Sequence, residues 1–357
     1  MYNSKEEAIK NFDPNGVGAV GTLFGLPFTP EQAQVVVIPV PWEVTVSYNS
    51  GTAKGPEAVL EASPQLDLHQ PDIPDAWKMG LAMLPVSEKW LHRSDELRAK
   101  AAHYIKALEE DTLSTQREAI RNLPASVNEA GEQLTAWVKK EAVELIEAGK
   151  LPVVLGGDHS TPLGLMQAIA EEKGAFGILQ IDAHADLRKA YEGFTYSHAS
   201  IMYNALQIKE VEKLVQVGIR DICGAEVQLA QKEKERVTIF YDRALKEQSY
   251  EGKTWQQQVR DILEPLPKQV YVSFDIDGLD PKLCPGTGTP VPGGLEFEQA
   301  MYLLKAVVES GRTIVGFDLC EVAPGYYSDW NGNVGARVLY RLANLAGVSN
   351  GWLNLKK

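Results

Sequence analysis

The sequence predicts an α/β protein built on a parallel sheet that helices cover on both faces. Eight short runs rich in Val, Ile and Leu alternate with longer amphipathic stretches along almost the whole chain of 357 residues. Most of the runs are continuously apolar, which is typical of strands buried on both faces of a sheet. Because the alternation continues almost end to end, we expect one doubly wound domain in place of two separate domains.

The expected strands lie at residues 35–40, 79–84, 152–155, 177–182, 214–218, 237–241, 269–275 and 313–319, the second being the weakest. Amphipathic periodicity predicts helices at residues 95–110, 129–148, 162–173, 297–310 and 336–346. Thr161 directly before Pro162 predicts that the third of these helices starts there, with Thr161 as its N-cap. We expect the polar segment 111–128 to be a surface connection between helices.

Residues 1–30 are rich in glycine and proline and predict an N-terminal extension that wraps the domain or a neighbouring subunit. We therefore divide the chain into this extension and a single domain over residues 31–357. The three cysteines are far apart and form no Cys-x-x-Cys pair, so we expect free buried thiols and neither a disulfide nor a thiolate zinc site.

Lys and Arg number 35 and Asp and Glu 48, so the formal net charge is −13 at pH 7. Nucleic acids and anionic membrane surfaces become poor partners, because both require a basic face on the protein. The sequence has no apolar run long enough to span a bilayer, and its first ten residues lack the apolar region of a signal peptide. We therefore expect a cytoplasmic protein with no nucleic acid or membrane partner.

Candidate functional residues follow three of the expected strands. The three segments are Gly156-Gly157-Asp158-His159-Ser160, Asp182-Ala183-His184-Ala185-Asp186 and Asp275-Ile276-Asp277-Gly278. In an open parallel sheet, ligands bind outside the carboxyl ends of the strands. We therefore expect six side chains to share one edge of the sheet: His159, Asp182, His184, Asp186, Asp275 and Asp277.

Each segment alone has an ordinary structural explanation, because glycines, histidines and aspartates are common in turns and helix caps. Asp-x-His-x-Asp is more specific, since alternate residues of an extended chain point the same way. Together the four aspartates would repel one another and raise their pKa values unless cations neutralised them. Two divalent ions that share Asp182 and Asp275 would balance the charge and supply hydroxide near neutral pH. The set therefore predicts a hydrolase, and imidazole with carboxylate suits Mn, Fe, Co or Ni.

The sequence resembles the ureohydrolase family, that of arginase and agmatinase, from Val35 to the end. The resemblance depends on the three segments above, on Leu279-Asp280-Pro281 after the third, and on Asp318-Leu319-Cys320-Glu321-Val322 at the last expected strand. It implies a three-layer α/β/α arginase-like fold with an eight-stranded parallel sheet, and assembly into trimers or hexamers. It also implies two manganese-type ions, with His159 and Asp186 on one, His184 and Asp277 on the other, and Asp182 and Asp275 on both.

The resemblance assigns catalytic roles to two further residues of domain 31–357. Glu321 would hold the guanidinium group of the substrate, since a carboxylate matches the paired N–H donors of a planar cation. His198 stands where the family has a proton-shuttling histidine, and an imidazole of ordinary pKa suits protonation of a leaving amine. The structural alternatives are a surface glutamate at a strand end and a histidine at a helix start. Asp158 is expected either to support the ligands or to begin a helix.

The family reaction is hydrolysis of a guanidinium C–N bond, which releases urea and an amine or ammonia. Arg188 stands where arginases have an asparagine that reads the amino acid head, so the sequence disfavours arginine. Loop aromatics could close the pocket around a short cation, with Trp330 as a substrate-binding residue beside Tyr326, Tyr327, Trp42, Tyr48, Phe194 and Tyr196. The alternative for each of these aromatics is a place in a subunit interface. This pattern resembles bacterial agmatinase-like enzymes that hydrolyse free guanidine with nickel. We therefore expect guanidine as the substrate, Ni²⁺ as the favoured metal, and metal-loading accessory proteins as further partners.

The main alternative is an agmatinase, which converts agmatine to putrescine and urea, or a guanidino-acid hydrolase, with Mn²⁺ as the metal. This alternative requires an open channel with a group that meets the far end of the substrate. A related zinc deacetylase of this fold normally carries adjacent histidines, and this chain has no His-His pair. A non-catalytic subunit would be expected to have lost ligands, whereas all six are present.

Overall fold

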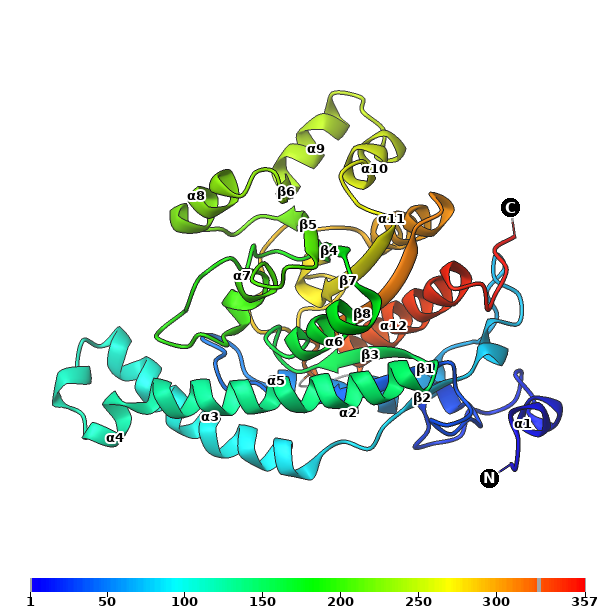
Figure 1. Ribbon diagram of the computed structural model, residues 1–357, viewed down its shortest axis with the longest axis horizontal. Coiled ribbons are helices and arrows are strands. Elements are labelled where there is room, and N and C mark those ends of the chain that lie inside the picture. The colour runs from blue at the N-terminus through cyan, green and yellow to red at the C-terminus, as the bar shows by residue number, and fades with distance from the viewer. Residues whose placement is uncertain (1, 326–328, 357) are drawn as a thin grey trace.

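The computed structural model describes residues 2–325 and 329–356. Within these residues eight strands form one parallel sheet in the order β2-β1-β3-β8-β7-β4-β5-β6 (Figure 1). The strands are β1 (Val35–Val40), β2 (Leu81–Met83), β3 (Leu151–Gly156), β4 (Phe176–Ile181), β5 (Val211–Ile219), β6 (Val237–Tyr241), β7 (Gln269–Asp275) and β8 (Thr313–Cys320). Each strand overlaps one of the eight expected runs, so the predicted eight-stranded parallel sheet is confirmed.

The central strands are buried on both faces. Every residue of β1, β3 and β4 is buried. Successive side chains of a strand point to opposite faces, so Val153 and Leu155 pack into one hydrophobic core and Val154 into the other. The continuous apolar runs in the sequence reflect this double burial, and the two cores confirm the three-layer α/β/α architecture.

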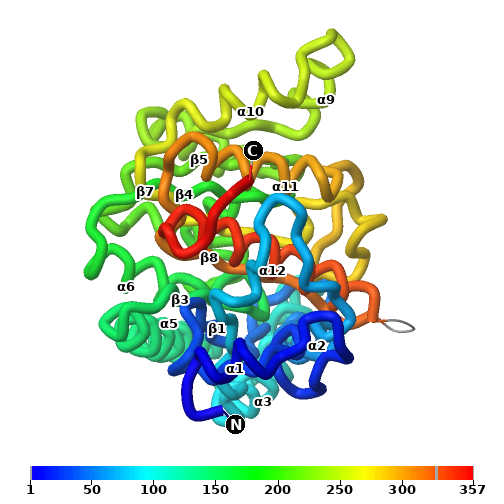
Figure 2. Tube along the Cα trace, turned by 90° about the vertical axis from the view of Figure 1, so that its right-hand side faces the viewer, coloured from blue at the N-terminus to red at the C-terminus, as the bar shows by residue number. Residues whose placement is uncertain are grey.

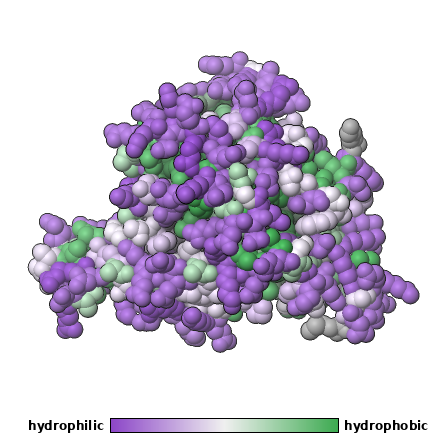
Figure 3. All heavy atoms as spheres, viewed as in Figure 1, coloured by the Kyte–Doolittle hydropathy of each residue, from purple (hydrophilic) through white to green (hydrophobic). Residues whose placement is uncertain are grey.

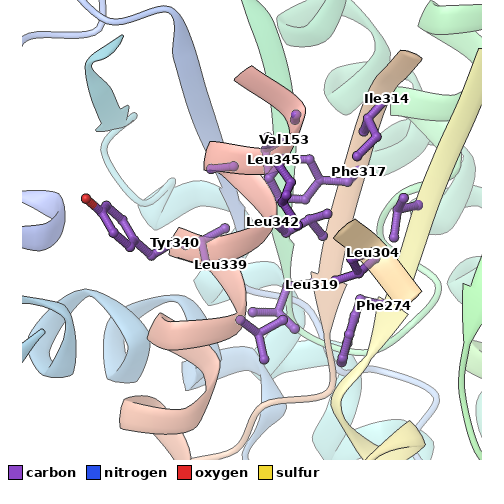
Figure 4. Packing of buried hydrophobic residues seen from close by; sticks show 14 of the residues in the cluster. Val153, Phe274, Leu304, Ile314, Phe317, Leu319, Leu339, Tyr340, Leu342 and Leu345 are labelled. Atoms are coloured by element: carbon purple, nitrogen blue, oxygen red, sulfur yellow. The ribbon is translucent and has the colours of Figure 1, made fainter. Parts of the chain in front are cut away.

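One face of the sheet is covered mainly by helices from the C-terminal third of the chain, together with one from its start. They are α10 (Trp255–Leu263), α11 (Phe297–Glu309) and α12 (Trp330–Ser349), joined by α2 (Gly55–Ala62). Leu339, Leu342 and Leu345 on α12 lie in the same core as Val153 and Phe317 of the sheet (Figure 4). This layer is joined by α1 (Lys5–Asn11), whose buried residue is Ala8.

The other face is covered by α3 (Glu88–Glu109), α5 (Leu123–Glu147), α6 (Leu163–Lys173) and α7 (Ile201–Ala205). Helices α3 and α5 extend well beyond the sheet, and the short α4 (Glu118–Arg121) lies at the tip of this projection (Figure 1). Segment 111–128 was expected to be a plain surface connection. It instead contains α4 and the first turn of α5, and most of its side chains are exposed or half-buried.

Two further details differ from the sequence expectations. Helix α6 begins at Leu163, and Thr161 does not cap it, because the Thr161 hydroxyl donates to the backbone oxygen of Asp158 at 3.0 Å. The sequence analysis also did not predict α8 (Gly224–Lys232), α9 (Asp242–Tyr250) and α10, which are short and rich in polar residues, although the capping box of Thr254 and Gln257 marks the start of α10.

The N-terminal extension packs on the body of the same chain. The ring of Phe24 lies 4.9 Å from that of Tyr340 on α12, and the Tyr340 hydroxyl donates to the backbone oxygen of Leu68 at 2.8 Å. Phe12 packs against Trp77 with ring centroids 5.1 Å apart. Figure 2 shows the extension crossing the outside of the helical layer near α1 and α2. The aromatic contacts show that it shares the core of the domain.

The surface of the protein is largely polar, as its many charged residues lead one to expect. The face in Figure 3 is largely hydrophilic, with smaller apolar patches between the polar groups. Among the residues that the structure describes, no helix combines the length and the apolarity that crossing a membrane requires. The four adjacent strands β3, β8, β7 and β4 end at one edge of the sheet, so the loops that follow them meet there.

Candidate active site

The loops at this edge bring one histidine and three aspartates together. His159 follows β3, Asp182 and Asp186 follow β4, and Asp275 ends β7. The Nδ1 atom of His159 lies 2.9 Å from Asp182 Oδ2, 3.0 Å from Asp186 Oδ2 and 3.2 Å from Asp275 Oδ2. All four side chains are buried. Their donor atoms therefore converge on a single point at the end of the sheet.

A second group forms around His184. Its Nδ1 atom lies 3.0 Å from Asp277 Oδ2 and 3.6 Å from Asp182 Oδ1. Asp182 thus contributes one carboxylate oxygen to each group. The other oxygen of Asp277 accepts a hydrogen bond from the backbone N–H of Ala183 at 3.0 Å, which fixes that carboxylate. The structure thereby brings together all six side chains that the sequence singled out as metal ligands.

The hydrogen bonds of His159 show that its inner nitrogen is suited to a metal ion. Its Nε2 lies 2.9 Å from Ser273 Oγ, and that hydroxyl donates its proton to Asp318 Oδ1 at 3.2 Å. Nε2 must therefore carry the ring proton, which leaves a free lone pair on Nδ1. Nδ1 has no hydrogen-bond partner despite the three nearby carboxylate oxygens. A divalent ion between this lone pair and the carboxylate oxygens would stabilise the arrangement, so the residues fit such an ion.

Burial and mutual repulsion perturb the aspartates strongly. Burial, together with the charges of Asp277 and Asp182, raises the pKa of Asp275 well above its ordinary value. Burial and the charge of Asp182 raise the pKa of Asp186 to about 7. For Asp182 itself burial acts upward, but the close contacts with the rings of His159 and His184 outweigh it and lower the pKa. Cations at this position would relieve the repulsion and keep all four groups ionised.

Further polar residues support the ligands, and the sequence analysis gave them no role. Tyr271 donates its hydroxyl to Asp318 Oδ2 at 2.7 Å, while Gln180 Nε2 donates to Asp182 Oδ2 at 2.7 Å. Tyr271 and Ser273 stand four and two residues before the aspartate that ends β7. Because alternate strand residues share a face, this spacing was the signal that could have identified them. Such partners orient metal-ligating side chains and tune their basicity.

Glu321 lies beside this cluster in a strained backbone conformation. It directly follows β8 and has a φ of 65°. Its Oε1 accepts a hydrogen bond from the backbone N–H of His159 at 2.9 Å, whereas its Oε2 is buried without a partner. Burial, followed by the charge of Asp158, raises the pKa of Glu321 well above its ordinary value. A fixed carboxylate with one unpaired oxygen is suited to a cationic group with paired donors.

His198 lies at the opposite side of the cluster. Its Nδ1 atom is 3.4 Å from Thr45 Oγ1, and its backbone N–H donates to the same hydroxyl at 3.3 Å. The ring of Tyr191 packs edge-on against it, with centroids 6.1 Å apart. Burial, and then the charges of His184 and His159, lower the pKa of His198 to about 3. The ring is therefore neutral near pH 7, which differs from the ordinary pKa assumed from the sequence.

A cavity of about 220 Å³ opens directly outside the histidine and aspartate cluster. His184, Asp186 and His198 form its inner wall. Its outer wall includes two carboxylates, two tyrosines and one arginine: Asp221, Glu226, Tyr48, Tyr191 and Arg188. The cavity therefore connects the candidate metal centre with a rim that carries charge of both signs.

Arg188 is held in place at this rim. Its guanidinium carbon lies 4.7 Å from the centroid of the Tyr191 ring, and its Nε lies 3.8 Å from Glu226 Oε2. Glu226 is buried and also accepts hydrogen bonds from the backbone N–H groups of Leu187 and Cys223. The positive charge of Arg188 is therefore already countered from two sides. Asp221 is exposed and remains the carboxylate most accessible from the cavity.

The structure separates the aromatic residues that the sequence grouped around the pocket. Tyr48 lines the cavity and is 74% exposed. Trp42 is instead buried against Trp90, and Phe194 is buried against Tyr104, so neither lines it. Loop position had suggested a pocket role, but both side chains point into the hydrophobic core.

Tyr196 and Trp330 are likewise absent from the described residues that line the cavity. Tyr196 packs against Gly131 on α5. Trp330 is the first residue of α12, is 48% exposed, and is not among the described residues that line the cavity. Tyr326 and Tyr327 lie outside the described residues. A substrate-binding role for Trp330 stays a prediction.

The fold and the site together define a class of metal-dependent hydrolases, with a three-layer α/β/α fold and a candidate two-metal centre at the carboxyl edge of a parallel sheet. The chain belongs to the arginase family, whose model matches residues 33–344. It is accordingly a ureohydrolase, a hydrolase that acts on the C–N bonds of amidine groups. The family resemblance stated from the motifs is confirmed.

Individual relatives match nearly the whole chain. An N(1)-aminopropylagmatine ureohydrolase from Thermus thermophilus is 34% identical over 93% of this chain and 97% of its own length. An agmatinase from Bacillus anthracis is 29% identical over 83% of this chain and 86% of its own length. The crystal structure of an agmatine ureohydrolase from Thermoplasma volcanium superposes with a TM-score of 0.69 at 22% identity, covering 96% of this chain and 97% of that one. This last likeness shows the fold.

Proposed function

We propose that this protein hydrolyses the guanidino group of an agmatine-type substrate, releasing urea and an alkylamine. The observation that carries the proposal is the buried, unpartnered Oε2 of Glu321 beside the histidine and aspartate cluster. Free guanidine was the first expectation from the sequence, and agmatine was the alternative. The relatives, named as agmatinase and as aminopropylagmatine ureohydrolase, support the alternative over free guanidine.

Two divalent metal ions complete the site in this proposal. His159 and Asp186 would hold one ion, His184 and Asp277 the other, and Asp182 and Asp275 both. The donor atoms of His159, Asp182 and Asp186 converge in one group and those of Asp182, His184 and Asp277 in a second, which supports Asp182 as a shared ligand. Such a pair supplies Lewis acidity and lowers the pKa of water to near neutrality. Imidazole and carboxylate ligands accept both Mn²⁺ and Ni²⁺. With an agmatine-type substrate we favour Mn²⁺, and Ni²⁺ belongs with the free guanidine alternative.

Glu321 orients the substrate. Its Oε1 is held by the backbone N–H of His159, so the carboxylate cannot rotate freely, and its Oε2 accepts an N–H of the guanidinium group. The buried charge of Glu321 is compensated only when a cation is bound, because the nearby Asp158 carries the same sign. Substrate binding thus relieves an electrostatic cost that the free protein carries.

His198 moves the proton to the leaving amine. The ring lines the cavity beside His184 and Asp186, so it can relay a proton between water and the leaving amine. The Thr45 hydroxyl lies 3.4 Å from its Nδ1 and orients the ring.

The rim of the cavity supports an amine tail over a carboxylate tail. Asp221 is exposed there, whereas the charge of Arg188 is countered by Glu226 and the Tyr191 ring. A substrate ammonium group would meet an accessible carboxylate, and a substrate carboxylate would meet an arginine that is already paired. The cavity of about 220 Å³ also leaves room beyond a guanidinium group for an alkyl chain.

The test is urea release by purified protein reconstituted separately with Mn²⁺ and Ni²⁺. Agmatine, N(1)-aminopropylagmatine, guanidine and 4-guanidinobutyrate are compared, with Asp275→Asn as the inactive variant and the exposed Asp67→Asn as its matched control. We expect the two amine-tailed substrates to give the highest kcat/KM. A clear preference for guanidine, or for guanidinobutyrate, would contradict the proposal that the substrate carries an alkylamine chain.

The finer expectations of assembly and location also belong to this proposal. We expect a homo-oligomer, a trimer or hexamer, in the cytoplasm, with accessory proteins that load the metal if the native ion is nickel. The family resemblance supports the assembly, and light scattering of the metal-loaded protein tests it.

A further inference from the structure

The segment 43–51 after β1 contacts both sides of the candidate active site. On one side, Thr45 Oγ1 holds the ring and the backbone N–H of His198. On the other side, Asn49 donates its backbone N–H to Gly288 O at 3.1 Å and its side-chain amide to Thr287 O at 3.2 Å. Gly288 adjoins Glu321, since a Cβ at that position would lie 2.6 Å from Glu321 Oε2. The conformation of this segment therefore affects both the proton-transfer side and the guanidinium side.

One side chain from the outer helical layer fixes this segment. Arg98 lies on α3 and donates through Nη1 to Val46 O at 2.5 Å and to Val44 O at 3.5 Å. Its Nη2 donates to Ser50 Oγ at 3.3 Å. The two carbonyls flank Thr45, so the guanidinium group fixes the peptides on both sides of the residue that contacts His198. No ligand motif of the sequence analysis includes Arg98.

The charge of Arg98 is also matched to its surroundings. The guanidinium group is partly buried and lies in the field of three carboxylates, those of Glu43, Asp158 and Glu192. Asp158 Oδ2 and Glu192 Oε2 are buried without hydrogen-bond partners. Glu43 accepts hydrogen bonds from the backbone N–H groups of Gly51 and Ala53, which hold the two ends of the same segment together. A neutral side chain at position 98 would remove a positive charge that acts on all three carboxylates, and Glu192 would keep only Arg188 as an opposite charge.

We propose that Arg98 is a positioning residue for the ureohydrolase reaction. It acts through Val44, Val46 and Ser50 to hold Thr45 against His198 and Asn49 against the loop beside Glu321. The proposal rests on the proposed function, because His198 and Glu321 are the groups that it positions. A planar guanidinium group with several fixed donors can bridge two carbonyls and a hydroxyl, whereas the single ammonium of a lysine cannot.

The kinetic test compares Arg98→Met and Arg98→Lys with Arg93→Met. Arg93 is a matched control, because it lies on the same helix and pairs with the exposed Glu96 at the protein surface. A displacement of catalytic groups by about 1 Å costs up to about 100-fold in rate. We expect kcat for agmatine to fall at least about tenfold in Arg98→Met and less in Arg98→Lys, with KM changed by less than about threefold. Equal kinetics of Arg98→Met and Arg93→Met would overturn the proposal.

A double-mutant cycle separates positioning from a general structural role. Thr45→Val removes the hydroxyl through which Arg98 is argued to reach His198. If Arg98 acts through Thr45, Arg98→Met lowers kcat much less in the Thr45→Val background than in the wild type. Additive losses would show that Arg98 stabilises the protein without positioning His198. Arg98→Lys in the same cycle keeps the test available if Arg98→Met does not fold.

Hydrogen exchange tests the same contact without any turnover. The amides of residues 43–53 include those of Asn49, Gly51 and Ala53, each of which has a hydrogen-bond acceptor in the structure. We expect these amides to exchange about tenfold faster in Arg98→Met than in Arg93→Met and the wild type. Unchanged exchange would overturn the proposal even if the kinetics changed. If the wild type releases no urea from any guanidino compound, the proposed function fails, while this readout still reports on Arg98.

Discussion

Replacing Glu321 with glutamine separates the charge of this residue from its shape. In Glu321→Gln the oxygen that accepts the His159 N–H at 2.9 Å is kept, and only the unpartnered Oε2 becomes an amide nitrogen. An amide nitrogen donates hydrogen bonds, so it meets the N–H groups of a guanidinium unfavourably. The substitution should therefore weaken substrate orientation while the surrounding loop stays in place.

The magnitude follows from the lost hydrogen bond. A hydrogen bond to a charged group contributes about 1.5–3 kcal/mol, which corresponds to about a 10-fold to 150-fold loss of kcat/KM. Stability should change in the opposite direction. The folded protein raises the pKa of Glu321, so the charged form destabilises the metal-free protein as the pH rises above the ordinary carboxyl range. Removing that charge should leave the Tm of the metal-free protein at pH 7 unchanged or higher.

The assay is urea release against agmatine concentration, combined with thermal unfolding of metal-free protein. The exposed Glu309→Gln is the control, since Glu309 pairs only loosely with Lys305 at 3.8 Å. The reasoning is refuted if Glu321→Gln retains wild-type kcat/KM. It is also refuted if the metal-free variant unfolds at a lower temperature than the control, because Glu321 would then stabilise the fold.

Four further measurements follow from the structure. Removal of metal by a chelator should lower the Tm by several degrees, since ligand at 100 times its Kd stabilises by about 2.7 kcal/mol; an unchanged Tm would argue against a metal centre. Ser273→Ala removes the partner of His159 Nε2 and should weaken metal binding about 10-fold to 100-fold, as measured by metal titration. Asp221→Asn should raise KM for agmatine by about fivefold and leave guanidine unaffected, because an exposed ion pair contributes at most about 1 kcal/mol. The hydrogen bond with Arg341 lowers the pKa of Asp72 to about 2, so this pair stabilises the protein above pH 4; Arg341→Met should be less stable by about 1 kcal/mol at pH 7, and its difference from the wild type should vanish as the pH falls toward 2.

Elements of the fold could be predicted where burial makes a run of residues apolar. They could not be predicted where a helix contains glycines, which are more typical of loops. The central strands are buried on both faces and continuously apolar, so their runs were found, and the less buried edge strands β2 and β6 were found from shorter apolar runs. Helix α12 was expected from residue 336, but it begins at Trp330. Its first turns contain Gly332 and Gly335, where any Cβ would collide with Ala58 O or with the Val59 side chain of α2. These glycines allow close helix packing, although in a sequence they resemble a turn.

The site could be predicted where ligands are close together in the chain. His159, Asp182 and Asp275 were found because each occupies a short segment directly after a strand. Gln180 was missed because a polar residue inside a strand looks like an interruption of the apolar run, whereas in the structure it supports Asp182. Trp42 was wrongly placed, because a loop position does not determine whether the side chain points to a pocket or to the core.

Two unfavourable features occur together in the loops of the site. Some residues have a strained backbone conformation, and several buried carboxylates repel one another. Among the described residues other than glycine, φ is positive at only six positions, and Asp186, Glu192 and Glu321 are three of them. Such conformations destabilise a protein by about 1–3 kcal/mol each and persist only where the surroundings enforce them. The same edge of the sheet concentrates buried carboxylates that repel one another. Cations that bind there would relieve the repulsion, so metal and substrate binding are coupled to the stability of the loops that form the site.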